Sequence, residues 1–313
     1  MKLTKLVNNY VQYKQALGVR FQTDAYLLET LCTLVGPAKC LSEITPAIIA
    51  KFLVCASGSV TYWYRKFAVL EGFNRFLTAH GYTLVLPLPT IKPQRKREFV
   101  PYILNRYEVA KFFAAIPACC EGKIVAPNTA RLVFLVLYGA GLRIGEVLSL
   151  KNKDVDLTEG LLMVRATKFY KTRLVPVAPP LQRELLLYHR WKSVQPSSKV
   201  DDAFFIDQKG RKLQDSQIRG AFENLRHHCR ISKPEFGQRP RIHDFRHTFA
   251  VQRLLTGYRR GEDVQDLLPK LATYLGHASI SSTQVYLTMT PDLLAEASKR
   301  FESHAFPEVP HES

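Results

Sequence analysis

Hydrophobic residues recur at helical spacing through the first eighty positions of the chain. Helices are expected over residues 23–34, 47–55 and 59–80, after a first helix whose apolar side consists of Leu3, Leu6, Val7, Tyr10 and Leu17. The longest helix carries its apolar face on Trp63, Phe67, Leu70, Phe73, Phe76 and Leu77. The pattern predicts a compact, all-helical domain over residues 1–90.

This helical part is followed by a segment that is rich first in proline and then in positive charge. Leu86-Pro87-Leu88-Pro89 disfavours a helix and stiffens the chain, and Arg95, Lys96 and Arg97 follow shortly after it. Residues 91–101 are therefore interpreted as a basic interdomain linker. Its charges either face only solvent or form a strap that crosses a DNA backbone.

The pattern after residue 102 combines helices with two short β-type stretches. Residues 161–164 and 172–177 read as strands, joined by a hairpin-like connection at residues 166–171. Helical periodicity surrounds them, at residues 105–114, 129–138, 144–150, 217–229, 246–255, 267–274, 282–289 and 291–301. The fold class is predicted as mainly α. The second domain, residues 102–303, is expected to be helical with a small antiparallel sheet, followed by a tail at residues 304–313.

The net charge narrows the choice of partner. A length of 313 residues fits two domains, and 46% hydrophobic residues is ordinary for a globular protein. The formal net charge of +17 favours a polyanionic partner, and nucleic acid is a commoner one than an anionic membrane. Residues 1–98 hold 13 Lys and Arg against 5 Asp and Glu. Both domains are therefore basic, as a clamp around double-stranded DNA would need.

Several other classes of protein are disfavoured. No run reaches the roughly 18 consecutive apolar residues of a membrane span, and the amino terminus lacks a signal-peptide core. The 6 cysteines show no paired C-x-x-C spacing, so a reducing, cytoplasmic location is expected. His227-His228-Cys229 has no second ligand pair at zinc-finger spacing, and no metal site is predicted.

Two arginines, several histidines and a late tyrosine are suited to phosphodiester chemistry. Such a transfer needs fixed positive charge on the non-bridging oxygens, a nucleophile that loses a proton, and an acid for the leaving oxygen. Arginine suits the first task because its planar guanidinium donates two hydrogen bonds to a phosphate. Considered singly, Arg143 and Arg246 would be read as surface residues and Tyr286 as a core residue.

Three segments, in order, give these residues a specific meaning. Residues 139–146 read Gly-Ala-Gly-Leu-Arg-Ile-Gly-Glu, His243-Asp244-Phe245-Arg246-His247 follows, and Leu275-Gly276-His277 stands nine residues before Tyr286. Over about residues 105–302 they resemble the signature boxes of the tyrosine recombinases, also called the phage integrase family. The resemblance implies the DNA breaking-rejoining fold for the second domain. For the first it implies a SAM-like core-binding domain that contacts DNA.

The resemblance also implies a role for each matching residue. Arg143 and Arg246 would clamp the scissile phosphate, His243 would bind it and assist proton transfer, and His277 would support it. Tyr286 would attack the phosphorus, leaving a 3′-phosphotyrosyl ester and a free 5′-hydroxyl. Two rounds of strand exchange would pass through a Holliday junction, with no metal or nucleotide cofactor.

A hairpin lysine completes the set that the family uses, because it protonates the leaving 5′-oxygen. Lys168 and Lys171 both lie in the expected hairpin. Counting back from Leu174-Val175-Pro176, the family pattern falls on Lys168, and Lys171 remains the alternative.

Other residues are expected in supporting or DNA-binding roles. Glu146 and Asp244 are expected to orient or cap the neighbouring arginines. His247 falls four residues after His243, as in some metal pairs, but no third ligand is apparent and the box explains both. The basic residues left for DNA phosphate are Arg65, Lys66 and Arg75 in the first domain and Arg95, Lys96 and Arg97 in the linker.

The segment at residues 257–264 departs from many family members. It is polar and longer than usual, so a loop is expected there. This region and the sequence after Tyr286 look most like integrases of bacterial transposons and mobile islands.

The resemblance implies a monomer in solution and a homotetramer on double-stranded DNA, because recombination needs four protomers on two sites. Leu294, Ala297 and Phe301 form a stripe on the tail helix that either packs within the chain or docks on a neighbouring protomer. The DNA target, the direction of the reaction and the need for a sister recombinase are not contained in the sequence. The alternatives are a type IB topoisomerase-like relaxer and a DNA-binding regulator without catalysis, although every catalytic position is filled.

Overall fold

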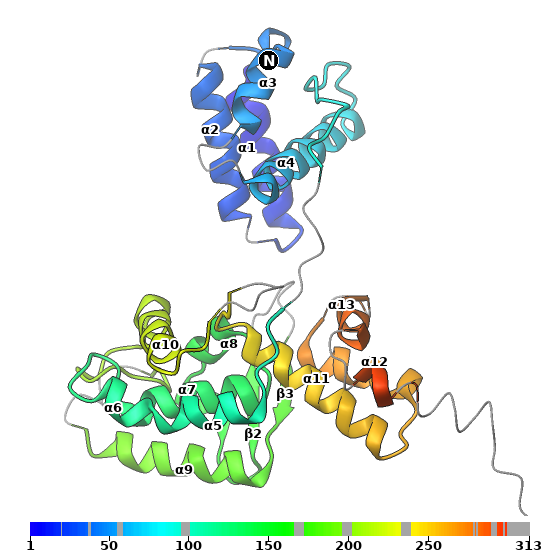
Figure 1. The fold of residues 1–313 in the computed structure, drawn as a ribbon. Coiled ribbons are helices and arrows are strands. Elements are labelled where there is room, and N and C mark those ends of the chain that lie inside the picture. The colour runs from blue at the N-terminus through cyan, green and yellow to red at the C-terminus, as the bar shows by residue number, and fades with distance from the viewer. Residues whose placement is uncertain are drawn as a thin grey trace, which may run out of the picture. The chain divides into compact units, whose positions relative to one another are not determined.

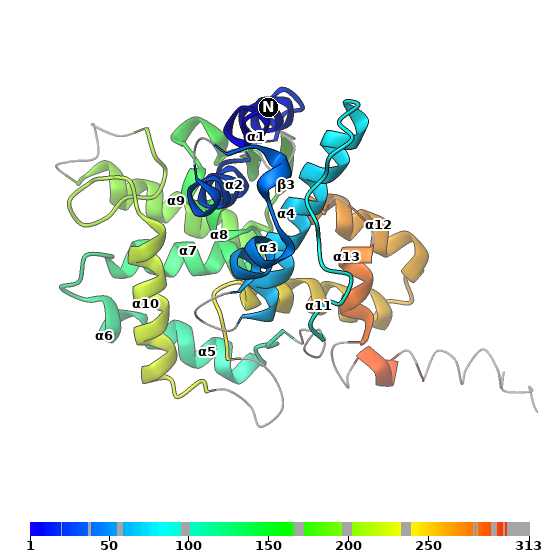
Figure 2. The same ribbon diagram turned by 90° about the horizontal axis from the view of Figure 1, so that it is seen from above.

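The computed structural model divides the chain into two compact units, Met1–Glu98 and Phe99–Ser313 (Figures 1 and 2). It describes residues 1–19, 21–36, 39–54, 59–94, 101–165, 172–195, 202–232, 239–277, 279, 281–288, 293–296 and 298. Each unit has a hydrophobic core of its own. Among the described residues, no helix is both long and apolar enough to cross a membrane.

The described part of the N-terminal unit contains four α-helices, as its periodicity predicted. They are α1 (Leu3–Ala16), α2 (Gln22–Val35), α3 (Pro46–Leu53) and α4 (Val60–Ala79), with a 3₁₀ turn at Leu41–Glu43. The apolar faces of these helices meet around Leu28, Ile49 and Leu70, which are fully buried. Oγ1 of Thr45 accepts a hydrogen bond from the backbone N–H of Ile48 at 3.4 Å and so caps α3.

Lys66 faces the interior of the N-terminal unit. The residue is only 9% exposed, and its ammonium group donates hydrogen bonds to the carbonyl oxygens of Phe52 and Val54. These two carbonyls lie at the carboxyl end of α3, where backbone acceptors have no partner within the helix. Lys66 therefore caps the carboxyl end of α3. The prediction that it is available to DNA phosphate is wrong.

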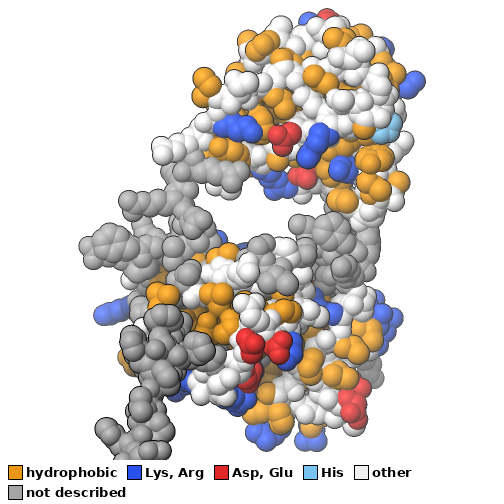
Figure 3. Space-filling view, turned by 90° about the vertical axis from the view of Figure 1, so that its right-hand side faces the viewer, with side chains coloured by type: hydrophobic (Ala, Val, Ile, Leu, Met, Phe, Trp, Pro, Cys, Tyr) orange, Lys and Arg blue, Asp and Glu red, His pale blue; other side chains and the backbone are white. Residues whose placement is uncertain are grey.

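The other two basic residues singled out on α4 are at its surface. Arg65 donates to Oδ1 of Asp24 at 3.0 Å in an exposed ion pair, which contributes little to stability. Arg75 is exposed. Figure 3 shows lysine and arginine side chains on the surface of this unit, among hydrophobic ones. Arg75 and Arg65 therefore remain candidates for contact with DNA.

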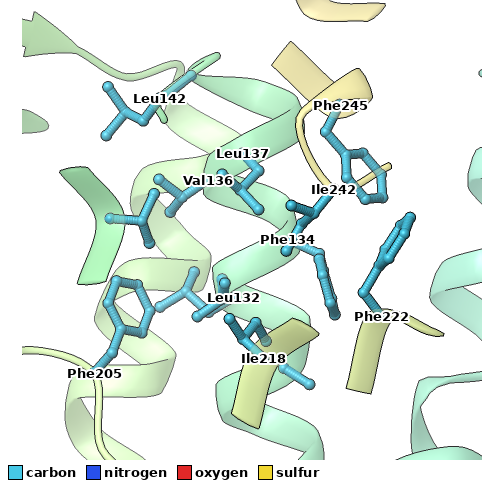
Figure 4. Packing of buried hydrophobic residues seen from close by; sticks show 14 of the residues in the cluster. Leu132, Phe134, Val136, Leu137, Leu142, Phe205, Ile218, Phe222, Ile242 and Phe245 are labelled. Atoms are coloured by element: carbon cyan, nitrogen blue, oxygen red, sulfur yellow. The ribbon is translucent and has the colours of Figure 1, made fainter. Parts of the chain in front are cut away.

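Helix α7 (Pro127–Gly139) is the centre of the second unit. Its Phe134 is fully buried, with its ring 6.3 Å from that of Phe222 and 5.7 Å from that of Phe245 (Figure 4). The other helices of this core are α5 (Arg106–Ala114), α6 (Ile116–Cys120), α8 (Ile144–Ser149), α9 (Pro179–Ser193), α10 (Asp215–His228) and α11 (Asp244–Arg259). The packing fixes the starts of α8 and α11, because Leu142 and Ile242 belong to the same core.

A small antiparallel sheet completes this unit, as the sequence predicted. Its strands are ordered β1 (Val155–Asp156), β2 (Leu161–Val164) and β3 (Arg173–Pro176). Val164 pairs with Arg173, so Arg173 is the first residue of the returning strand. The connection at residues 166–171 lies outside the described residues.

The segment before Tyr286 differs in one respect from the expected organisation. Helix α11 continues through Arg259 and α12 (Val264–Leu275) begins at Val264, so the loop expected at residues 257–264 shrinks to a tight turn. Gly257 permits this, because a Cβ there would lie 2.3 Å from Cδ2 of Leu267. The chain then forms α13 (Ser281–Gln284) and a 3₁₀ helix, Val285–Thr288.

The described part of the tail continues as helix at residues 293–296. Leu293 is buried with α11 and α12, and Nε of Arg259 lies 3.3 Å from Oε1 of Glu296. Of the predicted stripe, Leu294 is exposed, whereas Ala297 and Phe301 lie outside the described residues.

Replacing Lys66 by Met should destabilise the end of α3 by about 1–3 kcal/mol, because two carbonyl acceptors would lose their buried partner. Amide hydrogen exchange at residues 46–79 should speed up accordingly. Arg75→Met on the exposed side of α4 is the matched control and should change the same free energy by less than about 0.5 kcal/mol. Equal exchange in the two variants would contradict the role given to Lys66.

Candidate active site

The turn between α7 and α8 places Arg143. Gly141 has a φ of +61°, and a Cβ at this position would lie 2.4 Å from Cδ1 of Phe249, so both the backbone and the packing require glycine. Arg143 follows as the N-cap residue of α8, with its side chain 36% exposed. Its guanidinium Nη2 donates to the carbonyl oxygen of Gly276 at 3.2 Å, which joins two segments far apart in sequence.

The carboxylate of Glu146 is the centre of the site's hydrogen-bond network. It accepts from the backbone N–H of Arg143 at 2.9 Å and from Nη1 of the same residue at 2.8 Å. Arg173 donates to its two oxygens at 3.0 and 2.9 Å, and Nη1 of Arg246 lies 4.0 Å away. Burial alone would raise the pKa of Glu146, but the hydrogen bonds and charges of Arg173 and Arg143 lower it to about 2. The predicted supporting role of Glu146 is thus compatible with its contacts.

Arg173 joins the sheet to the rest of the site. Besides its two bonds to Glu146, it donates from Nε to the carbonyl oxygen of Tyr274 at 3.0 Å. Gly276 has a φ of +67°, and a Cβ there would lie 2.8 Å from Nη1 of Arg173, so the glycine makes room for the guanidinium. Arg173 was not among the residues predicted for the site, because a basic residue at the start of a short strand normally faces solvent.

Arg246 is buried inside the site. It is 1% exposed, and its Nη1 and Nη2 donate to the carbonyl oxygens of Gly141 and Leu275 at 2.8 and 2.7 Å. Burial, then the charge of Arg143, lower the pKa of Arg246 to about 10, so it stays charged at neutral pH. These bonds hold the guanidinium between the two segments that carry Arg143 and His277.

Three histidines surround these arginines, and burial is the first cause of a depressed pKa in each. The charge of Arg246 adds to burial in lowering the pKa of His243 and of His277 to about 4. For His247 the additional causes are led by His243, and its pKa falls to about 3. Nδ1 of His277 is 2.7 Å from Oγ1 of Thr283. All three rings are therefore neutral at physiological pH in the protein alone.

Tyr286 lies in the site formed by the arginines and histidines of its own chain, and it is only 3% exposed. Its hydroxyl oxygen is 3.0 Å from Nδ1 of His247, and its ring is stacked at 6.3 Å on that of His277. Burial raises the pKa of Tyr286, while the charges of Arg246 and Arg143 and a hydrogen bond from Arg246 oppose the rise. The tyrosine is therefore held by His247 and His277, within the positive field of the two arginines, and is protonated at neutral pH.

Positive charge exceeds negative charge in this site. Among the described residues, Glu146 is the one acidic side chain within 4.0 Å of Arg143, Arg173 or Arg246. Three guanidinium groups therefore share one carboxylate. A buried arginine without a full counter-charge is costly, so the arrangement favours binding of an anion such as a phosphodiester.

The family model described as "Phage integrase family" matches residues 107–292, more than half of the chain. The chain belongs to the phage integrase family. This confirms the family that the three sequence boxes indicated. One relative, "putative integrase/recombinase y4rE" of Sinorhizobium fredii (strain NBRC 101917 / NGR234), is 33% identical over 298 residues, which cover 95% of each chain.

Solved structures share the fold of this phage integrase family member. One is the integrase of the transposon Tn1549 in complex with transposon right-end DNA, with a TM-score of 0.68, 15% identity, and coverage of 97% of this chain and 100% of that chain. Another is a lambda integrase tetramer bound to a Holliday junction, with a TM-score of 0.64, 17% identity, and coverage of 91% and 77%. The predicted mainly helical fold with a small antiparallel sheet is confirmed.

The structure brings five of the six residues predicted as catalytic into one site: Arg143, His243, Arg246, His277 and Tyr286. The sixth, Lys168, and its alternative Lys171 lie outside the described residues, as do Arg95, Lys96 and Arg97 of the linker. Lys168 and Lys171 fall between β2 and β3, and β3 begins at the Arg173 that binds Glu146.

Asp244 acts at a different arginine from the one expected. It is fully buried and accepts from the backbone N–H of Arg241 at 2.7 Å, while Nη2 of Arg241 lies 3.4 Å from its other oxygen. Burial raises the pKa of Asp244 in spite of these bonds. The guanidinium of Arg246 is instead held by backbone carbonyls, so Asp244 secures the turn that presents His243.

Glu146→Gln should lower the free energy of unfolding of the catalytic unit near neutral pH by about 3 kcal/mol, the amount that corresponds to a pKa lowered from 4.5 to about 2. A carboxyl whose pKa is lower in the folded state stabilises the fold above pH 4.5 and loses this effect as the pH falls toward 2. The difference between the two proteins should therefore shrink by about 2 kcal/mol between pH 7 and pH 3 in urea titrations.

Glu159→Gln, at an exposed position, is the matched control and should leave the stability nearly unchanged at every pH. A Glu146→Gln difference that stays constant down to pH 3 would contradict the ionised, arginine-bound state of Glu146.

Proposed function

We propose that this chain is a site-specific DNA recombinase of the integrase or transposase type, which cleaves and rejoins strands through a 3′-phosphotyrosyl intermediate. The observation that carries the proposal is a buried tyrosine hydroxyl in contact with His247, in a site whose buried Arg246 is only partly neutralised. A tyrosine held in this way is suited to attack an anionic phosphorus centre, because the positive charge stabilises the charge that develops in the transition state.

The residues divide the work of this reaction between them. Arg143 and Arg246 hold the non-bridging oxygens of the scissile phosphate, with His243 and His277 donating further hydrogen bonds. The hydroxyl oxygen of Tyr286 forms a bond to phosphorus as the bond from phosphorus to the 5′-oxygen breaks. Lys168 supplies the proton that the leaving oxygen takes up, and a 5′-hydroxyl from a second strand later reverses the step. No metal or nucleotide cofactor enters this scheme.

The neutral histidines make the site responsive to its substrate. Their pKa values are depressed partly by the arginines around them. A phosphodiester bound between Arg143 and Arg246 would bring the missing negative charge and raise these pKa values toward the ordinary value. Proton transfer would then become efficient only when DNA occupies the site.

We further propose that both domains act on double-stranded DNA. Residues 1–90 are assigned as the core-binding domain, residues 91–101 as a basic strap, residues 102–303 as the catalytic domain and residues 304–313 as a tail. Because its proposed substrate is double-stranded DNA, we assign the protein to the cytoplasm. The likeness to integrases, including that of Tn1549, supports a role in movement of a mobile element.

A monomer in solution that assembles into a homotetramer on DNA is the proposed working form. The fold shared with a lambda integrase tetramer bound to a Holliday junction supports this. The exposed Leu294 leaves one part of the tail stripe available to a neighbouring protomer, although Leu293 is buried in the same chain. A sister recombinase is a further candidate for some of the four positions in this assembly.

The same observations give less support to two other functions. A DNA-binding regulator without catalysis has no need of a tyrosine hydroxyl placed against His247 and Arg246. A type IB topoisomerase-like relaxer would use the same chemistry without exchanging strands. The family membership, with an integrase/recombinase relative aligned over 95% of each chain, favours recombination.

A suicide substrate with a nick beside the cleavage position tests the chemistry. The natural protein should form a covalent protein–DNA adduct that resists denaturation and forms equally in EDTA, because the nucleophile is a side chain. Tyr286→Phe should form none. Tyr274→Phe, which removes a hydroxyl that donates to the Pro176 carbonyl, is the control and should keep the adduct. An adduct in Tyr286→Phe, or its loss in EDTA, would refute the mechanism.

The salt dependence of DNA binding tests the surface of the N-terminal domain. Arg75→Met should weaken binding and reduce the slope of log K against log salt by about 1, because one phosphate contact is lost. Lys66→Met serves as the comparison, and its slope should match that of the natural protein, since Lys66 is committed to carbonyls within the domain. Identical slopes for Arg75→Met and the natural protein would exclude Arg75 from the DNA interface.

A further inference from the structure

Attack by Tyr286 raises the question of where its proton goes. The hydroxyl is buried, and burial raises its pKa, so the proton does not leave to water unaided. The charge of Arg246 favours loss of the proton, but a guanidinium has no acceptor with which to take it. Another group must therefore receive it.

His247 is the acceptor that the structure places there. Its Nδ1 lies 3.0 Å from the hydroxyl oxygen of Tyr286, which is within the reach required of a general base. The ring is neutral, so one of its nitrogens carries a lone pair. If the hydroxyl donates along this contact, Nδ1 is the unprotonated nitrogen and Nε2 carries the hydrogen.

Among the described residues, neither of the other two histidines makes a hydrogen bond to the Tyr286 hydroxyl. Nδ1 of His277 is engaged with Oγ1 of Thr283 at 2.7 Å. The ring of His243 lies edge-on to that of His247, with 4.7 Å between the ring centres. Of the three histidines, His247 is therefore the one whose ring nitrogen contacts the nucleophile, and binding of the phosphate is left to His243 and His277.

The geometry points to His247 as a further catalytic residue, the general base that takes the proton of Tyr286 during attack. The O–H bond of Tyr286 breaks as a bond between Nδ1 of His247 and hydrogen forms. The tyrosine oxygen bonds to phosphorus, the bond to the 5′-oxygen breaks, and the proposed acid Lys168 protonates that oxygen. On rejoining, the imidazolium returns its proton to the tyrosine oxygen. This inference rests on the proposed recombinase function.

The surroundings of His247 make this base depend on bound DNA. The groups that face it are Arg246 on its own helix, His243 at the N-cap of that helix, Arg241 before it, His277 after α12, and Tyr286. The first four lower its pKa, to about 3 with burial, which makes it a weak base in the protein alone. The negative charge of a phosphodiester bound beside Arg246 would offset them and raise this pKa. Tyr286 would thus be activated only after a phosphodiester binds.

His247→Gln tests this assignment, because glutamine can accept a hydrogen bond but cannot take the proton. Single-turnover cleavage of the suicide substrate should slow by roughly 100-fold or more, the usual size of a general-base contribution. Affinity for an uncut site should stay within about twofold, which shows that the variant is folded. His228→Gln, at an exposed position on α10, is the matched control and should cleave at the natural rate.

A second substrate separates the base from the acid. In a 5′-bridging phosphorothiolate, sulfur replaces the leaving oxygen and departs without protonation, because a thiol is far more acidic than an alcohol. Lys168→Ala should recover fast cleavage on this substrate, whereas His247→Gln should stay slow. The natural protein should also show a cleavage rate that rises with pH to a plateau, and His247→Gln should lack this plateau.

Two results would overturn the inference. One is His247→Gln cleavage within about tenfold of the natural rate, which would make the contact one of packing. The other is recovery of His247→Gln on the phosphorothiolate, which would place His247 on the leaving-group side. In both cases Tyr286→Phe would still form no adduct, and the proposed function would stand. An adduct in Tyr286→Phe would instead refute the proposed function itself.

Discussion

The site depends on one buried carboxylate. Glu146 binds the guanidinium and the backbone of Arg143 and both terminal nitrogens of Arg173, so it ties the start of α8 to the start of β3. Arg173 and Arg143 extend the connection to the backbone of Tyr274 and Gly276. The start of α8, the start of β3 and the end of α12 are thus held together, although the first and last are more than 100 residues apart in the sequence. The hydrogen bonds that join them to the charged groups are charge-assisted, and such bonds are about twice as strong as neutral ones.

The single negative charge of this carboxylate does not neutralise the three guanidinium groups around it. Arg246 is almost wholly buried, yet its two terminal nitrogens are bound by backbone carbonyls, which carry no full charge. Burial and the positive charge that remains together keep three histidines neutral, and the same charge partly offsets the rise in the pKa of Tyr286 that burial causes. A DNA phosphate would supply the missing charge, so binding of the substrate and activation of the proton-transfer groups are parts of one electrostatic event.

Periodicity predicted the helical N-terminal domain and the small sheet well, because apolar burial at a 3.6- or 2-residue repeat is a local property. It failed where the fate of a side chain depends on distant backbone. Lys66 lies one residue from Arg65 on α4, and both read as surface cations. The end of α3 decides between them, because its unpaired carbonyls accept the ammonium of Lys66 and leave Arg65 at the surface.

The sequence by itself determined the family and five clustered candidates for catalysis, because Arg143, His243, Arg246, His277 and Tyr286 stand in boxes of recognisable composition and spacing. Only the tertiary structure decided what supports them. Arg173 reads as a strand residue and His247 as a duplicate of His243 until folding places one against Glu146 and the other against the Tyr286 hydroxyl. The spacing of residues along a chain indicates which of them share a helix or strand. Hydrogen bonds and charge balance in the site act between different elements, and only the packed core brings those elements together.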